Sequence, residues 1–167
     1  MSRSNCKNFD FGILIHGGSR TTKLKKVNKI TGSLKSSVSY GFDLLKKGSN
    51  AVDAVEAAVA SMEDGGIFNA GVGACLTIEK KIEMDASIMD GRDISAGSVG
   101  MVQDIKNPIK LARKIMKQTD HVTIVSDGLT NLLDLFERDI EEYRHDISEK
   151  LLNKYNSLVK NVGKKNG

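Results

Sequence analysis

A glycine-rich segment at residues 64–73 divides this chain into two parts with different patterns. Four of its ten residues are glycines, which disfavours a helix, and its apolar residues do not alternate as they would in a strand. We therefore expect a loop with an unusual backbone. The pattern before the loop is mainly helical, and the pattern after it has the period of two that is typical of strands. The sequence thus predicts a fold with both helices and strands.

The part before the loop predicts a short strand and a long helix. Residues 11–15 are an apolar run that ends in a glycine turn at residues 16–18, which indicates a buried strand. Apolar side chains then recur every three or four positions from Leu24 to Leu45, as on one face of an amphipathic helix. Gly48 suits the end of this helix, because glycine readily adopts the left-handed conformation that is common there.

A second helix leads into the loop, and a hairpin is expected after it. Either Ser49 or Asn50 can cap this helix, in which several alanines leave room for close packing. After the loop, residues 75–78 and 82–89 are expected to pair as two strands joined by a turn at residues 79–81. The loop would then lie between regular elements on both sides.

The pattern continues with a strand at residues 96–103 and a helix that begins at Asn107 and Pro108, since proline is favoured in the first helical turn. Residues 121–125 predict a further strand, and residues 126–136 a capped helix. The strands number about five in this interpretation. Nothing later in the chain completes the edges of their sheet, so either the sheet closes on itself or another chain completes it.

The predicted organisation is one domain over residues 1–136 followed by a charged segment. Residues 137–167 keep a weak helical spacing and fade into a flexible linker. The content of 40% hydrophobic and 28% charged residues is typical of a globular protein. Because there is no apolar run of membrane-spanning length and no signal-peptide pattern, we expect no membrane partner and a cytoplasmic location.

Few residues with catalytic or metal-binding chemistry stand close together in the sequence. His16, His121 and His145 are scattered, and neither Cys6 nor Cys75 has the spacing of a metal ligand. The formal net charge of +4 is mild, and no dense basic patch with stacking aromatic residues is present. We therefore expect no nucleic-acid partner.

Two glycine patterns match nucleotide-binding loops only in part. Residues 12–19 lack the lysine of a phosphate-binding loop, and residues 71–76 run into a strand pattern instead of a helix. Asp85, Asp90 and Asp93 could form a carboxylate pair, but turn caps and strand-edge acids explain them more simply. The residues alone thus leave an anion, an oxyanion or a cation as ligands for the glycine segments.

Five motifs follow one another along the chain. They are ILIHGG at residues 13–18, GSNAVDAVE at 48–56, FNAGVG at 68–73, EMDASIMDG at 83–91, and NP followed by AR at 107–113. In this order they resemble the plant-type asparaginase and isoaspartyl peptidase family of N-terminal-nucleophile hydrolases. Each motif is weak alone, but the ordered series is specific and covers most of the chain. Arg20 departs from the family pattern, which usually has a small residue there.

The resemblance implies a four-layer αββα sandwich of the α+β class, of which this chain forms the N-terminal, α-subunit part. Family members cut themselves before a threonine, whose hydroxyl then attacks a side-chain amide while its own α-amino group acts as the base. By resemblance, Gly167 precedes this autocleavage site. The threonine would begin a partner β subunit in an (αβ)₂ assembly. The implied substrates are L-asparagine, β-aspartyl dipeptides or both, and this chain alone is expected to be inactive.

The resemblance also assigns residues in the glycine loop. Asn69 matches an asparagine that supports the nucleophile. No organic cofactor is implied, but a structural sodium ion is, because carbonyl oxygens suit a hard cation. Its implied ligands are the backbone carbonyl groups of Met62, Glu63, Gly65, Phe68, Ala70 and Val72. The alternatives are a glycosylasparaginase-like hydrolase, for which a signal peptide and more cysteines are expected, and a catalytically dead fragment that acts as a basic binding or structural protein.

Overall fold

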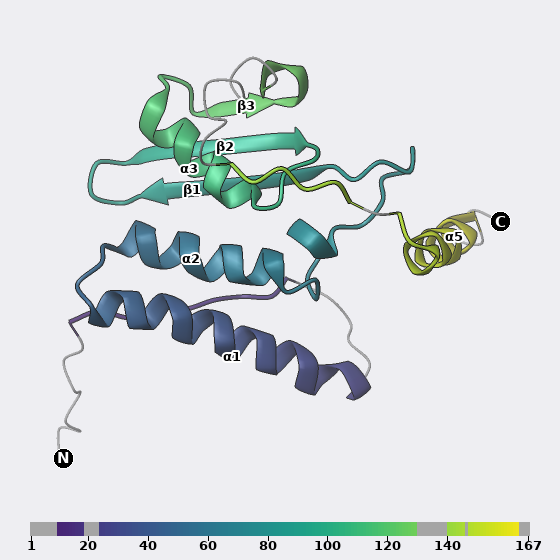
Figure 1. Ribbon diagram of the computed structural model, residues 1–167, viewed down its shortest axis with the longest axis horizontal. Coiled ribbons are helices and arrows are strands. Elements are labelled where there is room, and N and C mark those ends of the chain that lie inside the picture. Colours follow the sequence, from purple (N-terminus) through teal and green to yellow (C-terminus); the bar gives the residue numbers. More distant parts are fainter. Residues whose placement is uncertain (1–9, 19–23, 130–139, 146, 164–167) are drawn as a thin grey trace, which may run out of the picture.

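The computed structural model describes residues 10–18, 24–129, 140–145 and 147–163. In Figure 1 the helices α1 (Leu24–Lys46) and α2 (Ala51–Asp64) lie side by side, and a three-stranded sheet lies beyond α2. The chain therefore combines helices and strands, as the sequence predicts.

The turn between α1 and α2 is stabilised by Gly48 and Asn50, two residues that the sequence predicts at helix ends. Gly48 has a φ of +85°, and the N–H of Ser49 donates to the carbonyl of Leu44 at 3.0 Å, which satisfies one of the last carbonyl groups of α1. Asn50 is the N-cap of α2, and its Oδ1 accepts a hydrogen bond from the N–H of Asp53 at 2.9 Å. Both predicted helix boundaries are confirmed.

Small residues allow α1 and α2 to pack closely. A Cβ atom at Gly41 would lie 2.7 Å from the carbonyl oxygen of Ala54 and 3.2 Å from the Cβ of Ala58. The hydroxyl groups of Ser37 and Ser61 form a hydrogen bond of 3.0 Å between the two helices. The alanines of α2 thus have the packing role that the sequence suggests.

The sheet has the strand order β1-β2-β3. β1 (Met84–Asp90) pairs antiparallel with β2 (Ser95–Val102), and β2 pairs parallel with β3 (Thr123–Val125). The register of β1 and β2 shifts at Asp85, whose Oδ1 accepts a hydrogen bond from the N–H of Met101 at 2.9 Å. The carboxylate thereby satisfies a backbone group that the irregular ladder leaves unpaired.

The helix α3 (Pro108–Gln118) connects β2 to β3 and packs against the sheet. Pro108 occupies its first turn, as predicted. At Gly97 in β2, a Cβ atom would lie 2.2 Å from the carbonyl oxygen of Ala112 and 2.5 Å from the backbone nitrogen of Met116. The backbones of α3 and β2 therefore approach one another as closely as a glycine permits.

One hydrophobic core joins α2, α3 and one face of the sheet. Its members are Val52, Ala60, Ala74, Ile82, Met84, Ile88, Val99, Val102, Ile105, Ile109, Leu111, Ala112, Ile115, Ile124 and Leu129. On the opposite face of the sheet, Met89 is 57% exposed and Val125 is 52% exposed. The described residues thus cover only one face of the sheet.

One predicted strand and one predicted hairpin are wrong. Residues 11–15 form no strand, and the side chains of Phe11 and Leu14 are 41% and 92% exposed. Within the described part of the chain, no strand pairs with this segment, and an apolar run without a partner cannot form a ladder. The hairpin expected directly after the loop is reduced to a single bridge between Leu76 and Ile82, and β1 pairs with β2 along one edge.

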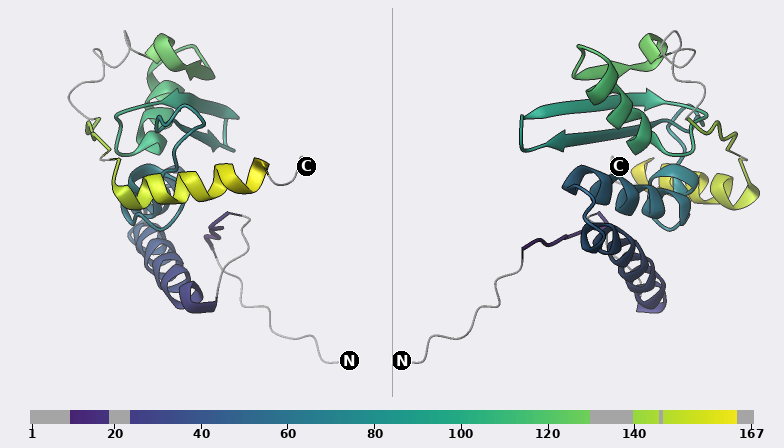
Figure 2. Two further views of the ribbon diagram at one scale, coloured as in Figure 1. Left: turned by 90° about the vertical axis from the view of Figure 1, so that its right-hand side faces the viewer. Right: turned by 60° about the vertical axis from the view of Figure 1, so that its left-hand side comes forward.

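The charged C-terminal segment contains the helix α5 (Glu149–Gly163), which runs across the direction of α1 and α2 (Figures 1 and 2). Of the helix predicted at residues 126–136, the structure describes the short helical turn η2 (Ser126–Leu129), and the rest lies outside the described residues. Among the helices of the described ranges, none has the length and apolar character needed to cross a membrane.

Candidate functional site

The turn at residues 16–18 and the glycine loop at residues 64–73 lie against each other. A Cβ atom at Gly17 would lie 2.7 Å from Cε1 of Phe68, so the N-terminal turn packs directly on the glycine loop. Gly18 has a φ of +88°, and its N–H donates to Nδ1 of His16 at 3.0 Å. His16 thus stabilises the turn, and the two segments together form the candidate site.

The glycine loop has a compact backbone that excludes side chains. It includes the short helical turn η1 (Gly71–Gly73). A Cβ atom at Gly71 would lie 2.6 Å from the carbonyl oxygen of Glu63, and one at Gly73 would lie 2.2 Å from that of Phe68. Gly71 also has a φ of +52°, a conformation that favours glycine. The glycines are therefore required by contacts with backbone oxygen atoms.

The carbonyl oxygens of Glu63 and Phe68 are two of the six that are predicted to bind a sodium ion. Of the six predicted carbonyl groups, that of Ala70 accepts a hydrogen bond from the N–H of Gly73 at 3.1 Å. Neutral carbonyl oxygens are ligands that a hard cation accepts. In the described ranges, no cluster of three or more His, Cys, Asp or Glu side chains could hold a metal ion instead. The crowding of carbonyl groups around Gly71 and Gly73 is compatible with a cation that binds the backbone.

Asn69 is held at the exposed side of the loop. Its Oδ1 accepts a hydrogen bond from the N–H of Cys75 at 2.7 Å, which joins the loop to the chain that leaves it. The residue itself is exposed, so its amide can face another chain or a ligand. Its partner Cys75 is a half-buried free cysteine.

The side chain of Glu63 is a feature that the sequence analysis missed. The residue is 3% exposed, and its Oε1 accepts a hydrogen bond from the N–H of Ile109 at 3.2 Å. Burial raises the pKa of this carboxyl group to about 7. Asn107 supports the same junction, because its Nδ2 donates to Oδ1 of Asp64 at 3.0 Å. The end of α2, the start of α3 and the loop are thus joined by polar side chains.

The sequence model of the asparaginase family matches residues 10–166. This chain belongs to the asparaginase family. It is 42% identical over 150 residues to the plant-type L-asparaginase of Pyrococcus horikoshii, a match that covers 84% of this chain and 48% of the relative. It is 42% identical over 151 residues to that of Thermococcus kodakarensis (90% and 48% covered) and 44% identical over 117 residues to the human isoaspartyl peptidase/L-asparaginase (70% and 38% covered). The chain spans about half the length of the archaeal relatives and less of the human one.

Membership in the asparaginase family confirms the resemblance that the five motifs suggested. The names of the relatives do not favour the glycosylasparaginase-like alternative or the basic binding protein. Two of the motifs meet through Arg113 of α3, which forms ion pairs with Asp53 and Glu56 of α2. The side chain of Arg113 is 12% exposed. These charged motif residues therefore join the two helices.

The aspartates considered as a carboxylate pair have structural roles in this chain. Asp90 pairs with Arg92 at 2.6 Å, and hydrogen bonds from Arg92 lower the pKa of Asp90 to about 2. The Oδ1 of Asp93 accepts a hydrogen bond from the N–H of Ser95 at 3.0 Å. The simpler interpretation as turn caps and strand-edge acids is confirmed.

Gly167, the predicted cleavage residue, lies outside the described residues.

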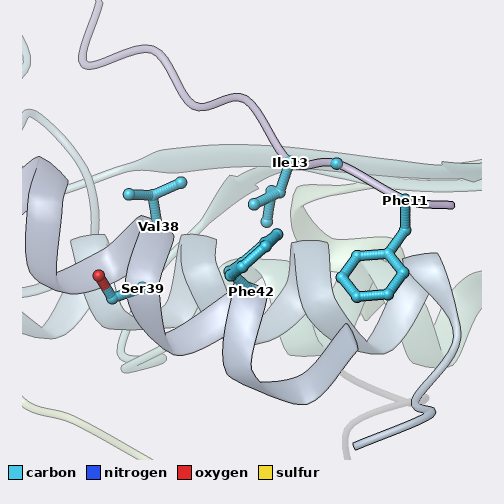
Figure 3. A pocket seen from close by; sticks show the side chains of 6 residues that line it. Phe11, Ile13, Val38, Ser39 and Phe42 are labelled. Atoms are coloured by element: carbon cyan, nitrogen blue, oxygen red, sulfur yellow. The ribbon is translucent and has the colours of Figure 1, made fainter. Parts of the chain in front are cut away.

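A separate groove of about 510 Å³ lies between the N-terminal segment and α1. Figure 3 shows Phe11 and Ile13 beside Val38 and Phe42. The ring centres of Phe11 and Phe42 are 5.5 Å apart. Ser39 supplies the single hydroxyl group among the lining side chains. This apolar groove does not suit the polar substrates named for asparaginase relatives, so the candidate site remains the glycine loop.

Proposed function

We propose that this chain is the α subunit of a self-processing amidohydrolase that hydrolyses the side-chain amide of L-asparagine, β-aspartyl dipeptides or both. The strongest support comes from comparing how much of this chain and how much of its relatives the matches cover. The family match spans almost the whole chain, whereas the chain spans only 48% of the archaeal relatives. A second half of similar length would supply the rest of the enzyme.

The open face of the sheet supports a partner of this kind. Met89 on β1 and Val125 on β3 are exposed on the side that α3 does not cover. A sheet that exposes large apolar side chains to water gains stability when a second sheet packs over them. We propose that the β subunit brings this second sheet and completes a four-layer αββα sandwich in an (αβ)₂ assembly.

In this proposal the nucleophile is the threonine that begins the β subunit. Its hydroxyl attacks the amide carbon, and its free α-amino group takes up the proton. This chain contributes the surroundings: Asn69, held by the N–H of Cys75, supports the threonine, and the turn at residues 16–18 supports the loop through Phe68. Before cleavage, Gly167 would carry the carbonyl group of the bond that is cut.

A sodium ion would be held by backbone carbonyl groups in the loop that carries Asn69. The proposed ligands are the carbonyl oxygens of Met62, Glu63, Gly65, Phe68, Ala70 and Val72. Such an ion supplies positive charge that fixes the direction of these carbonyl groups. The role of the protein is to hold the loop compact, which Gly71 and Gly73 allow.

The experiment that tests this proposal is the expression of the full-length gene, followed by intact-mass measurement under denaturing conditions. We expect two chains that copurify, the first ending at Gly167 and the second beginning with threonine. The purified pair should release ammonia from L-asparagine or split a β-aspartyl dipeptide. A single unsplit chain without either activity would contradict the proposal.

A further inference from the structure

A histidine from the C-terminal part of the chain holds the backbone of the glycine loop. The Nε2 atom of His145 lies 2.9 Å from the carbonyl oxygen of Gly71, although the two residues are 74 positions apart in the sequence. Because a carbonyl oxygen only accepts hydrogen bonds, Nε2 carries a proton and donates this bond. The sequence showed His145 only as one of three scattered histidines. The fold brings it to the candidate site.

The loop needs a restraint of this kind because its own residues leave the backbone free to change. Four of the ten residues at 64–73 are glycines, which adopt several backbone conformations at little cost. The carbonyl oxygen of Gly71 also accepts a hydrogen bond from the N–H of Ala74 at 3.0 Å, but this bond closes the short turn η1 and can move with it. The bond from His145 instead ties the turn to another part of the molecule.

The chain that carries His145 is itself fixed to the core. Ile105 and Glu142 form an antiparallel bridge, and backbone hydrogen bonds of 2.9 and 3.0 Å join residues 104–106 to residues 141–143 on either side of it. Ile105 is 2% exposed and belongs to the hydrophobic core. His145 follows this pairing by two residues. The core therefore determines where the backbone of His145 begins.

The ring of His145 is oriented by an aromatic neighbour. The ring of Tyr143 meets it edge to face, with the ring centres 4.7 Å apart and an angle of 87° between the ring planes. The other ring nitrogen, Nδ1, is buried and has no hydrogen-bond partner among the described residues. A buried polar atom without a partner costs free energy, so hydrogen bonding of both ring nitrogens does not explain this placement. The bond from Nε2 to the loop does.

We propose that His145 is a positioning residue for the proposed reaction, because its hydrogen bond to Gly71 holds the loop in the conformation that presents Asn69. This inference rests on the proposed function, in which Asn69 supports the threonine. Asn69 lies two residues before Gly71, and its partner Cys75 lies four residues after it. The restrained carbonyl group thus lies between the two ends of the bond that holds Asn69. Loosening the turn at Gly71 changes the direction of the Asn69 side chain while the elements around the loop stay in place.

The test compares the full-length gene product with its His145→Phe and His145→Gln variants. Phenylalanine keeps a ring beside Tyr143 but has no donor, whereas glutamine supplies an N–H group in place of Nε2. His121→Phe is the matched control, since His121 is exposed and precedes β3. Amide hydrogen exchange of peptides over residues 64–75 and over α1 is followed by mass. The kcat and KM are measured with the substrate that the wild type hydrolyses.

We expect the loop amides of His145→Phe to exchange roughly five-fold faster than those of the wild type, the factor for losing one typical hydrogen bond. The kcat should fall by a similar factor while KM stays unchanged, because Asn69 supports the threonine rather than the substrate. His145→Gln should recover most of both losses. Exchange over α1 should equal that of the wild type in every variant, and His121→Phe should match the wild type throughout.

Each other outcome has a definite meaning. Loop exchange at the wild-type rate in His145→Phe overturns the inference, and so does faster exchange with an unchanged kcat. Faster exchange over α1 as well indicates a general structural defect, and equal losses in His145→Gln or His121→Phe show that the hydrogen bond is not the cause; both results overturn the positioning role. A wild type without activity refutes the proposed function and this inference with it, whereas an active wild type beside an unaffected His145→Phe refutes the inference alone.

Discussion

At the scale of single residues, the carboxyl group of Glu63 gives the clearest pH dependence. Its pKa is raised from 4.5 to about 7 by burial, so the folded state binds the proton more tightly than the unfolded state. The contribution of this carboxyl group to the free energy of unfolding should be largest below pH 4.5 and fall as pH rises to about 7. A shift of this size corresponds to about 3 kcal/mol. Urea unfolding of the full-length protein in sodium-free buffer at several pH values measures it.

The variant Glu63→Gln should remove most of this pH dependence, because glutamine keeps an oxygen for the N–H of Ile109 and has no proton to lose. Glu79→Gln is the control, as this acid pairs with Lys81 on the surface. An unchanged dependence of the free energy of unfolding on pH in Glu63→Gln would show that another group is responsible.

The sequence could predict that Asn50 caps α2 and that Gly48 ends α1, because both roles depend on neighbouring residues. It could not predict the burial of the Glu63 carboxyl group, because its hydrogen-bond partner lies in another helix.

At the scale of elements, the close contact of β2 with α3 depends on Gly97, which has no side chain. We expect Gly97→Ala to destabilise the full-length protein by more than about 2 kcal/mol, because its Cβ would lie 2.2 Å from the carbonyl oxygen of Ala112 and backbone atoms cannot move aside cheaply. Gly91→Ala is the control, since nothing lies within 4 Å of that position. Equal Tm values for the two variants would contradict this account.

The elements also show where sequence patterns are sufficient. The helices α1, α2 and α3 were predicted because their apolar periods, caps and first-turn proline are local signals. The run at residues 11–15 has an equally clear apolar pattern, yet it forms no strand. Pairing partners determine strands, and a sequence pattern does not show which segments will meet. The same reason explains why the sequence did not show that β1 would pair with β2.

At the scale of the whole molecule, the exposed face of the sheet should be covered by another part of the full-length protein. We expect a cysteine at Met89→Cys to resist thiol reagents in the native state, because a second sheet would bury a side chain that is 57% exposed in this chain. Lys117→Cys, at an exposed position of α3, serves as the control and should react quickly. Both are made with Cys6 and Cys75 replaced by serine, and labelling is followed by mass. Equal labelling rates would show that no second sheet covers this face, and would remove the four-layer sandwich from the proposal while leaving the family membership intact.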